Sequence, residues 1–244
     1  WRWWRWGSGY SDGLDSVETF ADGGSTVTTR DGQITVTYEQ APDDAPQNVT
    51  ATPLDGDSVE VDFDPVAGAD GYRAYRDTEP GVTTGDTLVD DVSAPPVTDT
   101  GLLDGTAYHY VVVAYIDAEG PTSTEVSART DLPAPYGLDV TAERATEFDC
   151  VWNAAHDNGT TRLECKPTDA SEWGSAAPGG AETVVDHTVE EATLTGLRTG
   201  EDYDIRVVAV TEDAETPDTD PATAVVAGTY GGERYGSQQF GGPE

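Results

Sequence analysis

Two cysteines, Cys150 and Cys165, are the residues of this chain best suited to covalent chemistry. Each falls on the inward face of a predicted strand, and the two strands are expected in opposite sheets. A disulfide across the core is then feasible; it would close a loop of about 15 residues and stabilise by roughly 3 kcal/mol. The alternative is two buried thiols that pack as small hydrophobic groups. The expected extracellular location favours the disulfide, and two ligands are too few for a structural zinc site.

The histidines and carboxylates show no catalytic arrangement. His109, His156 and His187 fall on separate predicted strands and loops, and no nucleophile elbow, zinc-protease helix, phosphate loop or dinucleotide-binding glycine pattern occurs. Asp and Glu number 47, so close carboxylate pairs are expected by chance and lose their value as a catalytic signal. We predict that the protein is not an enzyme.

Acid-rich loops at 212–215 and 218–220 carry oxygen ligands that would suit Ca²⁺ or Mg²⁺, but not with the spacing of a Ca²⁺-binding loop. A solvated acidic face is the favoured interpretation, so no metal site or cofactor is predicted beyond weak Ca²⁺ or Mg²⁺ binding. Two N-glycosylation sequons begin at Asn48 and Asn158. The second lies in a predicted loop and is the better candidate.

The charge of the chain is strongly negative. Twelve Lys and Arg residues oppose 47 Asp and Glu residues, which gives a formal net charge of −35, and Lys166 is the only lysine. Such a surface repels itself in dilute buffer, whereas molar salt shortens the Debye length to about 3 Å and screens the repulsion. The acids are spread over every segment, a pattern that resembles haloarchaeal proteins. Nucleic-acid binding is not expected, because no basic patch lies outside the first six residues.

The first six residues contain four of the six tryptophans of the chain. This segment consists of Trp1, Arg2, Trp3, Trp4, Arg5 and Trp6. Exposed aromatic clusters of this kind mark interaction sites, and Trp and Arg are enriched at binding hot spots. The favoured interpretation is an anchor that inserts into a partner subunit. Packing against the chain's own first domain ranks second, and binding at a membrane interface ranks third.

A β-hairpin is predicted after this segment, because β-branched runs at 25–29 and 33–38 flank an Asp-Gly turn. A lone hairpin is marginally stable in water, so it is expected to add to a neighbouring sheet. Residues 1–45 are thus predicted to form an aromatic arm, a hairpin and a polar linker. The Gly- and aromatic-rich tail at 230–244 is expected to dock on a neighbour if the chain belongs to a larger assembly, and the alternative is a solvated end. The start at Trp1 and the lack of any Met predict a chain that is trimmed, processed or part of a longer product.

Two segments with one pattern organise the rest of the chain. Residues 101–115 and 196–210 each run from a glycine-rich turn through a tyrosine, Tyr108 or Tyr203, into a β-branched strand. A tyrosine at this point fills the edge of a β-sandwich core, and its hydroxyl bonds back to the backbone of the turn. The repetition predicts two sandwiches, the first of them closed by a strand over 123–128.

Further positions align the two copies: Phe63 corresponds to Trp152, and Tyr72 to Leu163. With their Pro-led first strands and Leu–Gly–Tyr corners, residues 46–229 resemble the fibronectin type III family. The resemblance implies an all-β fold, with two tandem immunoglobulin-like sandwiches behind an N-terminal extended arm and β-hairpin. The expected domains are 46–131 and 132–229. Phe63 departs from the family's core Trp, which is a tolerable aromatic exchange.

Sandwiches of this family host many roles, so the functional expectation rests on resemblance. It is a non-enzymatic structural or binding protein of an extracellular assembly, specifically a tail, fibre or capsid-decorating virion component of a halophilic archaeal virus. The expected partners are subunits of the same assembly, in a homo-oligomer, and a host-surface receptor or glycan. A membrane partner is not expected, because no apolar run reaches transmembrane length. The alternatives are a haloarchaeal cell-surface or pilus-like adhesin and an accessory module of a secreted hydrolase.

Overall fold

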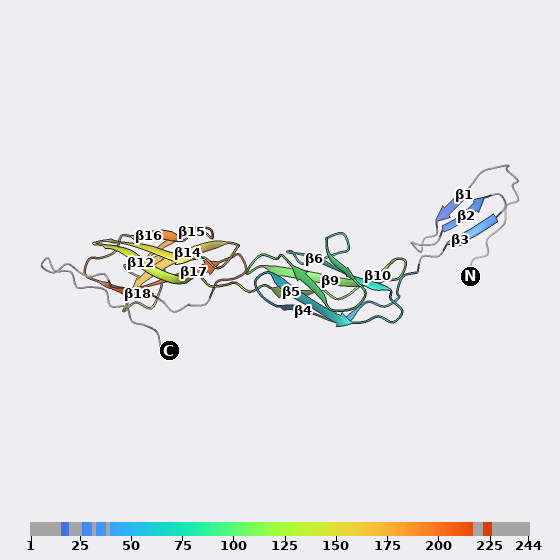
Figure 1. The fold of residues 1–244 in the computed structure, drawn as a ribbon, viewed down its shortest axis with the longest axis horizontal. Helices are drawn as coiled ribbons and strands as arrows, with labels where there is room; N and C mark the ends of the chain where they lie inside the picture. Colours follow the sequence, from blue (N-terminus) through green and yellow to red (C-terminus); the bar gives the residue numbers. More distant parts are fainter. Residues whose placement is uncertain (1–15, 20–25, 31–32, 38–39, 217–221, 226–244) are drawn as a thin grey trace.

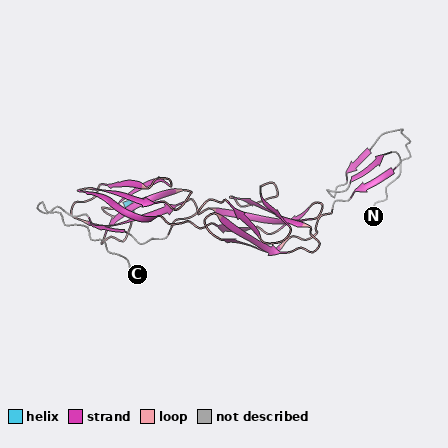
Figure 2. Cartoon of the chain, viewed as in Figure 1, coloured by secondary structure: helices cyan, strands magenta, loops and turns pink. Residues whose placement is uncertain are grey.

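The computed structural model describes residues 16–19, 26–30, 33–37, 40–216 and 222–225. Apart from one short 3₁₀ helix, η1 (Gly174–Ala176), the regular elements of these residues are β-strands, as Figure 2 shows. They form a small N-terminal sheet followed by two β-sandwiches in tandem (Figure 1). The predicted all-β fold class is confirmed.

The N-terminal sheet has three antiparallel strands in the order β1-β2-β3. Their bounds are β1 (Ser16–Thr19), β2 (Thr26–Arg30) and β3 (Gln33–Thr37). β2 and β3 are the predicted hairpin, with Arg30 paired to Gln33. β1 was not predicted, because four residues inside a Gly-, Ser- and Asp-rich stretch are too few to show alternation.

The first sandwich packs a three-stranded sheet against a five-stranded one. The smaller sheet has the order β4-β5-β8, with β4 (Gln47–Pro53), β5 (Ser58–Asp64) and β8 (Val97–Thr100). The larger has the order β10-β9-β6-β7, and β11 also pairs with β9. Its strands are β6 (Gly71–Asp77), β7 (Thr87–Val92), β9 (Ala107–Tyr115), β10 (Glu119–Thr122) and β11 (Val126–Arg129).

The core of the first sandwich follows from alternation along its strands. Val59, Val61 and Phe63 of β5 are buried, and the Phe63 ring lies 4.9 Å from that of Tyr72 on the opposite sheet. Full burial of such a side chain stabilises by about 1.5–3 kcal/mol. The buried Tyr110 keeps its hydroxyl satisfied by donating to Asp99 Oδ2 at 3.0 Å.

The closing strand of this sandwich differs from the expected 123–128. It is split into β10 and β11, and Ser123 lies between them. The backbone N–H of Ser123 donates to Val112 O at 2.8 Å, while its hydroxyl accepts from Val112 N at 2.9 Å. The serine side chain therefore takes over one ladder bond where the strand is interrupted, a substitution that the sequence pattern does not reveal.

The second sandwich repeats the arrangement with sheets in the orders β12-β13-β16 and β15-β14-β17-β18. The first sheet contains β12 (Tyr136–Arg144), β13 (Glu147–Asn153) and β16 (Glu191–Thr195). The second contains β14 (Thr160–Pro167), β15 (Ala181–Asp186), β17 (Asp202–Val210) and β18 (Ala222–Val225). Trp152 and Leu163 are buried in its core, as expected from their counterparts in the first sandwich.

The two tyrosine corners have the same geometry. Tyr108 Oη accepts from the backbone N–H of Leu103 at 3.1 Å, and Tyr203 Oη accepts from that of Arg198 at 2.9 Å. Both donors lie five residues before their tyrosine. The predicted bond from each hydroxyl to its turn is confirmed.

Candidate functional site

The most distinctive polar arrangement lies where the two sandwiches meet. We call it the joint: residues 102–107 and 129–132 on the side of the first sandwich, and 154–159 and 211–214 on that of the second. Gly105 N donates to Asp131 O at 3.0 Å, and Asp131 N donates to Asp55 O at 3.1 Å. These bonds tie the short connecting segment back to the first sandwich, so its direction is fixed before the second sandwich begins.

Asp104 and Asp157 form the centre of the joint. Asp104 N donates to Asp157 Oδ1 at 3.0 Å, and Asp157 N donates to Asp104 Oδ2 at 2.8 Å. Hydrogen bonds in which the acceptor is ionised are stronger than neutral ones. Each sandwich thus satisfies a backbone N–H of the other, in a pair that requires one relative orientation.

A second group of bonds surrounds this centre. Asn158 Nδ2 donates to Thr106 Oγ1 at 2.9 Å and to Asp104 O at 3.3 Å. The Thr211 hydroxyl donates to Gly105 O at 2.8 Å. Gly105 has a φ of +59°, and a Cβ there would lie 3.0 Å from Leu132 Cβ and 3.1 Å from Thr211 Cγ2. The sandwiches therefore approach each other at a position that only glycine fits.

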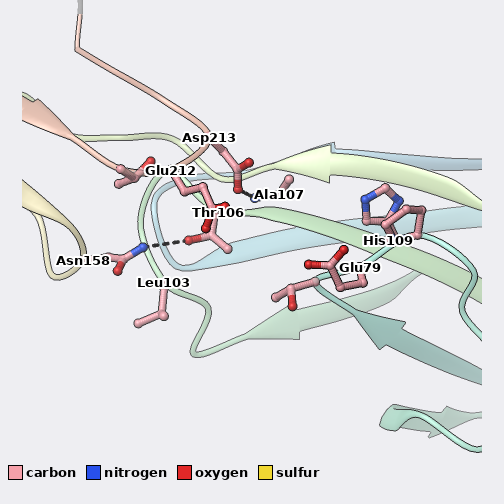
Figure 3. Close-up of a pocket in the computed structure, with 11 residues that line it drawn as sticks. Glu79, Leu103, Thr106, Ala107, His109, Asn158, Glu212 and Asp213 are labelled. Carbon is pink, nitrogen blue, oxygen red and sulfur yellow. Dashed lines mark hydrogen bonds between the residues drawn. The ribbon is translucent and has the colours of Figure 1, made fainter.

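Asp213 makes the third connection. Its Oδ2 accepts from Ala107 N at 2.9 Å, and its carbonyl oxygen accepts from Arg129 Nη1. Figure 3 shows the bond to Ala107 together with that between Asn158 and Thr106. Because these bonds come from two separate loops of the second sandwich, rotation about any single contact is opposed by the others.

The joint is also a concentration of negative charge. Burial raises the pKa of Asp104 above its ordinary value, and the nearby charges of Asp157 and Asp57 add to the effect. Ionised, these carboxylates repel one another while accepting the bonds that join the sandwiches. Salt reduces the repulsion between exposed charges, so the joint is expected to be firmer in concentrated salt.

A groove of about 490 Å³ opens beside these bonds (Figure 3). Glu79 and His109 line it from the first sandwich, and Asn158 and Glu212 from the second. Leu103, whose side chain is 47% exposed, forms part of its wall. The volume lies within the range of about 300–1,000 Å³ that is usual for ligand pockets.

The cysteines lie in the core of the second sandwich, on β13 and β14 of opposite sheets. Both are buried and are not joined in the structure, and the predicted disulfide stays a prediction. Burial raises the pKa of Cys150 to about 12 and that of Cys165 to about 11. As thiols they would be protonated at neutral pH and would pack as small hydrophobic groups.

The two sequon asparagines lie in different surroundings. Asn158, the favoured candidate, is half-buried in the joint, where its Nδ2 donates both bonds to the first sandwich. A glycan on that nitrogen would occupy the space between the sandwiches. Asn48 is exposed, and its Nδ2 donates to Asp64 Oδ2 at 2.7 Å. Geometry therefore favours Asn48 over Asn158 as a glycosylation site.

Two histidines that the sequence left apart come together next to the joint. The rings of His156 and His187 lie 6.2 Å apart. His156 is buried, with Nε2 at 3.3 Å from Thr161 Oγ1 and Nδ1 without a hydrogen-bond partner. Burial and the neighbouring His187 lower the pKa of His156. Sequence spacing alone did not predict this pair, because His187 lies on the distant turn after β15.

An ionic cluster on the outer face of the second sandwich was also not predicted. Glu164 is buried to 3% exposure and accepts from Arg206 at 2.6 Å, with Arg162 at 3.5 Å. The Trp173 ring covers the cluster, with the Arg206 guanidinium 4.3 Å and Lys166 Nζ 5.1 Å from its centroid. A signal was present in the sequence: charged residues, Arg162, Glu164 and Lys166, recur at alternate positions of one strand.

Some predicted residues fall outside the described part of the chain. They are the aromatic arm at 1–6, the acidic loop at 218–220 and the tail at 230–244. Within the described residues, no three His, Cys, Asp or Glu side chains are grouped to hold a metal ion. Within the same residues, no helix has the length and apolar character of a membrane span.

The fold and the joint define a tandem pair of β-sandwiches. Residues 133–225 match the family model "Fibronectin type III domain", which confirms the resemblance for the second sandwich. A two-domain fibronectin type III segment of chicken tenascin superposes with a TM-score of 0.57, over 75% of this chain and 98% of that one, at 18% identity. This likeness extends the fold to both sandwiches.

A sequence relative points to the same group of proteins. Tenascin-R of Gallus gallus is 28% identical over 169 residues, or 68% of this chain. The chain spans only 12% of the length of that relative. The match therefore covers a small part of that relative, and the activity of the longer protein does not follow from it.

Proposed function

We propose that this chain is a non-enzymatic structural and binding protein of an extracellular assembly. Specifically, it would be a tail, fibre or capsid-decorating component of the virion of a halophilic archaeal virus. The aromatic arm at 1–6 anchors it among other subunits of a homo-oligomer. The sandwiches act as a spacer that presents a surface to a host receptor or glycan.

The observation that carries the structural role is the joint. Reciprocal bonds between Asp104 and Asp157, supported by Asn158 and Asp213, hold the sandwiches in file. A flexible linker would leave the domains free to move relative to each other. A pair of sandwiches joined by these bonds keeps one relative orientation. A spacer requires this, because it must hold its outer end at a fixed position.

The halophilic context is supported by how the scarce cations are used. Arg73 pairs with Asp91 and Glu119, and Arg144 pairs with Glu147 and Asp149. Within the part of the chain that the structure describes, most carboxylates form no such ion pair, and their mutual repulsion depends on salt for screening. A rise in thermal unfolding temperature from 0.1 M to 3 M KCl is therefore expected. A chain equally stable at both salt concentrations would contradict the halophilic assignment.

The virion assignment is tested by mass spectrometry on purified particles and on cell envelopes. Finding the chain in particles at a fixed stoichiometry supports the proposal. Finding it only in envelopes would favour a haloarchaeal surface or pilus-like adhesin. A catalytic domain encoded in the same polypeptide would favour the third role, an accessory module of a secreted hydrolase.

A further inference from the structure

The groove at the joint combines exposed apolar surface with carboxylates that, within the described part of the chain, form no ion pair. Glu79 and Glu212 face it from opposite sandwiches (Figure 3). Among the described residues, neither carboxylate forms an ion pair. Leu103 and Pro80 add exposed apolar surface to the same lining. Arg129 lies nearby, but its Nη1 already donates to Asp213 O.

Such a lining fits a ligand that carries guanidinium and aromatic groups together. Guanidinium groups pair with carboxylates in a planar, bidentate geometry, and indoles gain free energy by covering apolar side chains. His109 also lines the groove; its Nδ1 lies 3.2 Å from Glu125 Oε1, so its ring edge is directed to that carboxylate. A neutral aliphatic ligand would leave both glutamates without a partner.

The chain itself carries a segment with this chemistry. Residues 1–6 combine four tryptophans with two arginines, which are two of the twelve cations of a chain with a net charge of −35. We propose that the arm at 1–6 of one copy binds in the groove at the joint of a second copy. The inference rests on the proposed anchoring function and names the surface that receives the anchor.

The length of the arm indicates that the arm bound in a groove comes from a second copy of the chain. Nine residues separate Trp6 from the start of β1, and they span at most about 32 Å when extended. The N-terminal sheet and the joint lie at opposite ends of the first sandwich (Figure 1). Strand β9 alone, with nine residues, covers about 30 Å of the intervening length. The arm would have to reach along the whole length of the first sandwich to bind the joint of its own copy.

An arm-to-joint contact joins two different surfaces. Contacts of this heterologous kind build rings when the rotation closes and open fibres when it does not. The proposal therefore predicts assemblies larger than dimers at high concentration. It also places every occupied groove over the bonds that hold the sandwiches together, so assembly would stiffen the joint.

The first test is sedimentation velocity of the full chain in molar KCl over a range of concentrations. Deleting residues 1–6 is expected to abolish association. Leu103→Ser is expected to weaken association about tenfold, because it removes apolar surface from the groove. Leu88→Ser is the matched control, because Leu88 is 48% exposed on β7 against 47% for Leu103. Circular dichroism checks that each variant is folded.

Mixing two defective chains gives the sharper test. The chain lacking residues 1–6 keeps its groove, and a Leu103→Ser, Glu79→Gln, Glu212→Gln variant keeps its arm. Together they are expected to form a one-to-one complex and nothing larger. Unchanged association of the groove variant on its own would overturn the proposal while leaving the anchoring function intact. Unchanged association after deletion of the arm would overturn both.

Discussion

Asp104 and Asp157 each donate a backbone N–H to the carboxylate of the other across the boundary between two sandwiches. The pair is attractive through its hydrogen bonds and repulsive through its charges. Burial raises the pKa of Asp104, because it destabilises the charged form of the carboxyl group relative to the neutral form. The balance between the two effects depends on salt, and this leads to the first prediction.

Asp104→Asn is expected to stabilise the joint in dilute salt. An amide oxygen still accepts from Asp157 N, while the repulsion from Asp157 and Asp57 is lost, a gain of about 0.5 kcal/mol that shrinks in molar salt. Asp104→Ala removes the acceptor and is expected to cost about 1–2 kcal/mol. Thermal unfolding and small-angle X-ray scattering, at low and high salt, measure both. Asp139→Asn, which removes one exposed charge from β12, is the control. Equal effects of the two Asn variants would contradict a special role for Asp104.

Acid is expected to weaken the second sandwich through His156. An unfolded histidine takes up a proton as the pH falls through about 6.5. In the folded chain burial and His187 lower the pKa of His156, so the unfolded state binds this proton first and the free energy of unfolding falls with it. Urea unfolding at pH values from 7.5 to 5 measures this loss in the free energy of unfolding. The His156→Gln variant is expected to lose less over the same range. An NMR titration giving His156 a pKa at or above 6.5 would refute the explanation.

The oxidation state of the cysteines is open to direct measurement. If Cys150 and Cys165 are thiols, iodoacetamide should label them only after unfolding, because both are buried and their pKa values lie at about 12 and 11. Cys150→Ser is then expected to cost about 1–3 kcal/mol, because a buried hydroxyl needs a hydrogen-bond partner. Mass spectrometry after unfolding without a reductant reads the result. Absence of labelling until a reductant is added would establish the disulfide.

The tyrosine corners should contribute equally to their own sandwiches. Tyr108→Phe and Tyr203→Phe each leave one backbone N–H without its acceptor, that of Leu103 or Arg198. Each change is expected to cost about 1–2 kcal/mol in urea unfolding. Tyr136→Phe, at a ring that is 63% exposed, serves as the control and should change little. Losses no larger than in the control would show that the corner bonds are energetically minor.

The sandwiches could be predicted because their signals are local. Phe63 and Trp152 stand at matching points of alternating strands, and Tyr108 and Tyr203 follow matching turns. Each of these side chains is buried because the alternation of its own strand, or the turn before it, directs it into the core. The interrupted strand at Ser123 was missed, because a side chain took over a backbone role there.

The joint could not be predicted, because its contacts join loops that are far apart in the sequence. Asp104 and Asp213 look like ordinary members of a chain with 47 acids. Asn158 was singled out as a sequon, while its amide nitrogen in fact bonds the first sandwich. Only the orientation of one sandwich on the other gives these residues their roles, and no strand periodicity encodes that orientation.

A side chain at Gly105 would change the angle between the two sandwiches and would also strain the backbone, because φ is positive there. A methyl group there would lie 3.0 Å from Leu132 Cβ and 3.1 Å from Thr211 Cγ2, at the boundary between the two sandwiches. The expected response is a tilt of the second sandwich relative to the first. This one position therefore fixes the direction in which the second sandwich extends from the first.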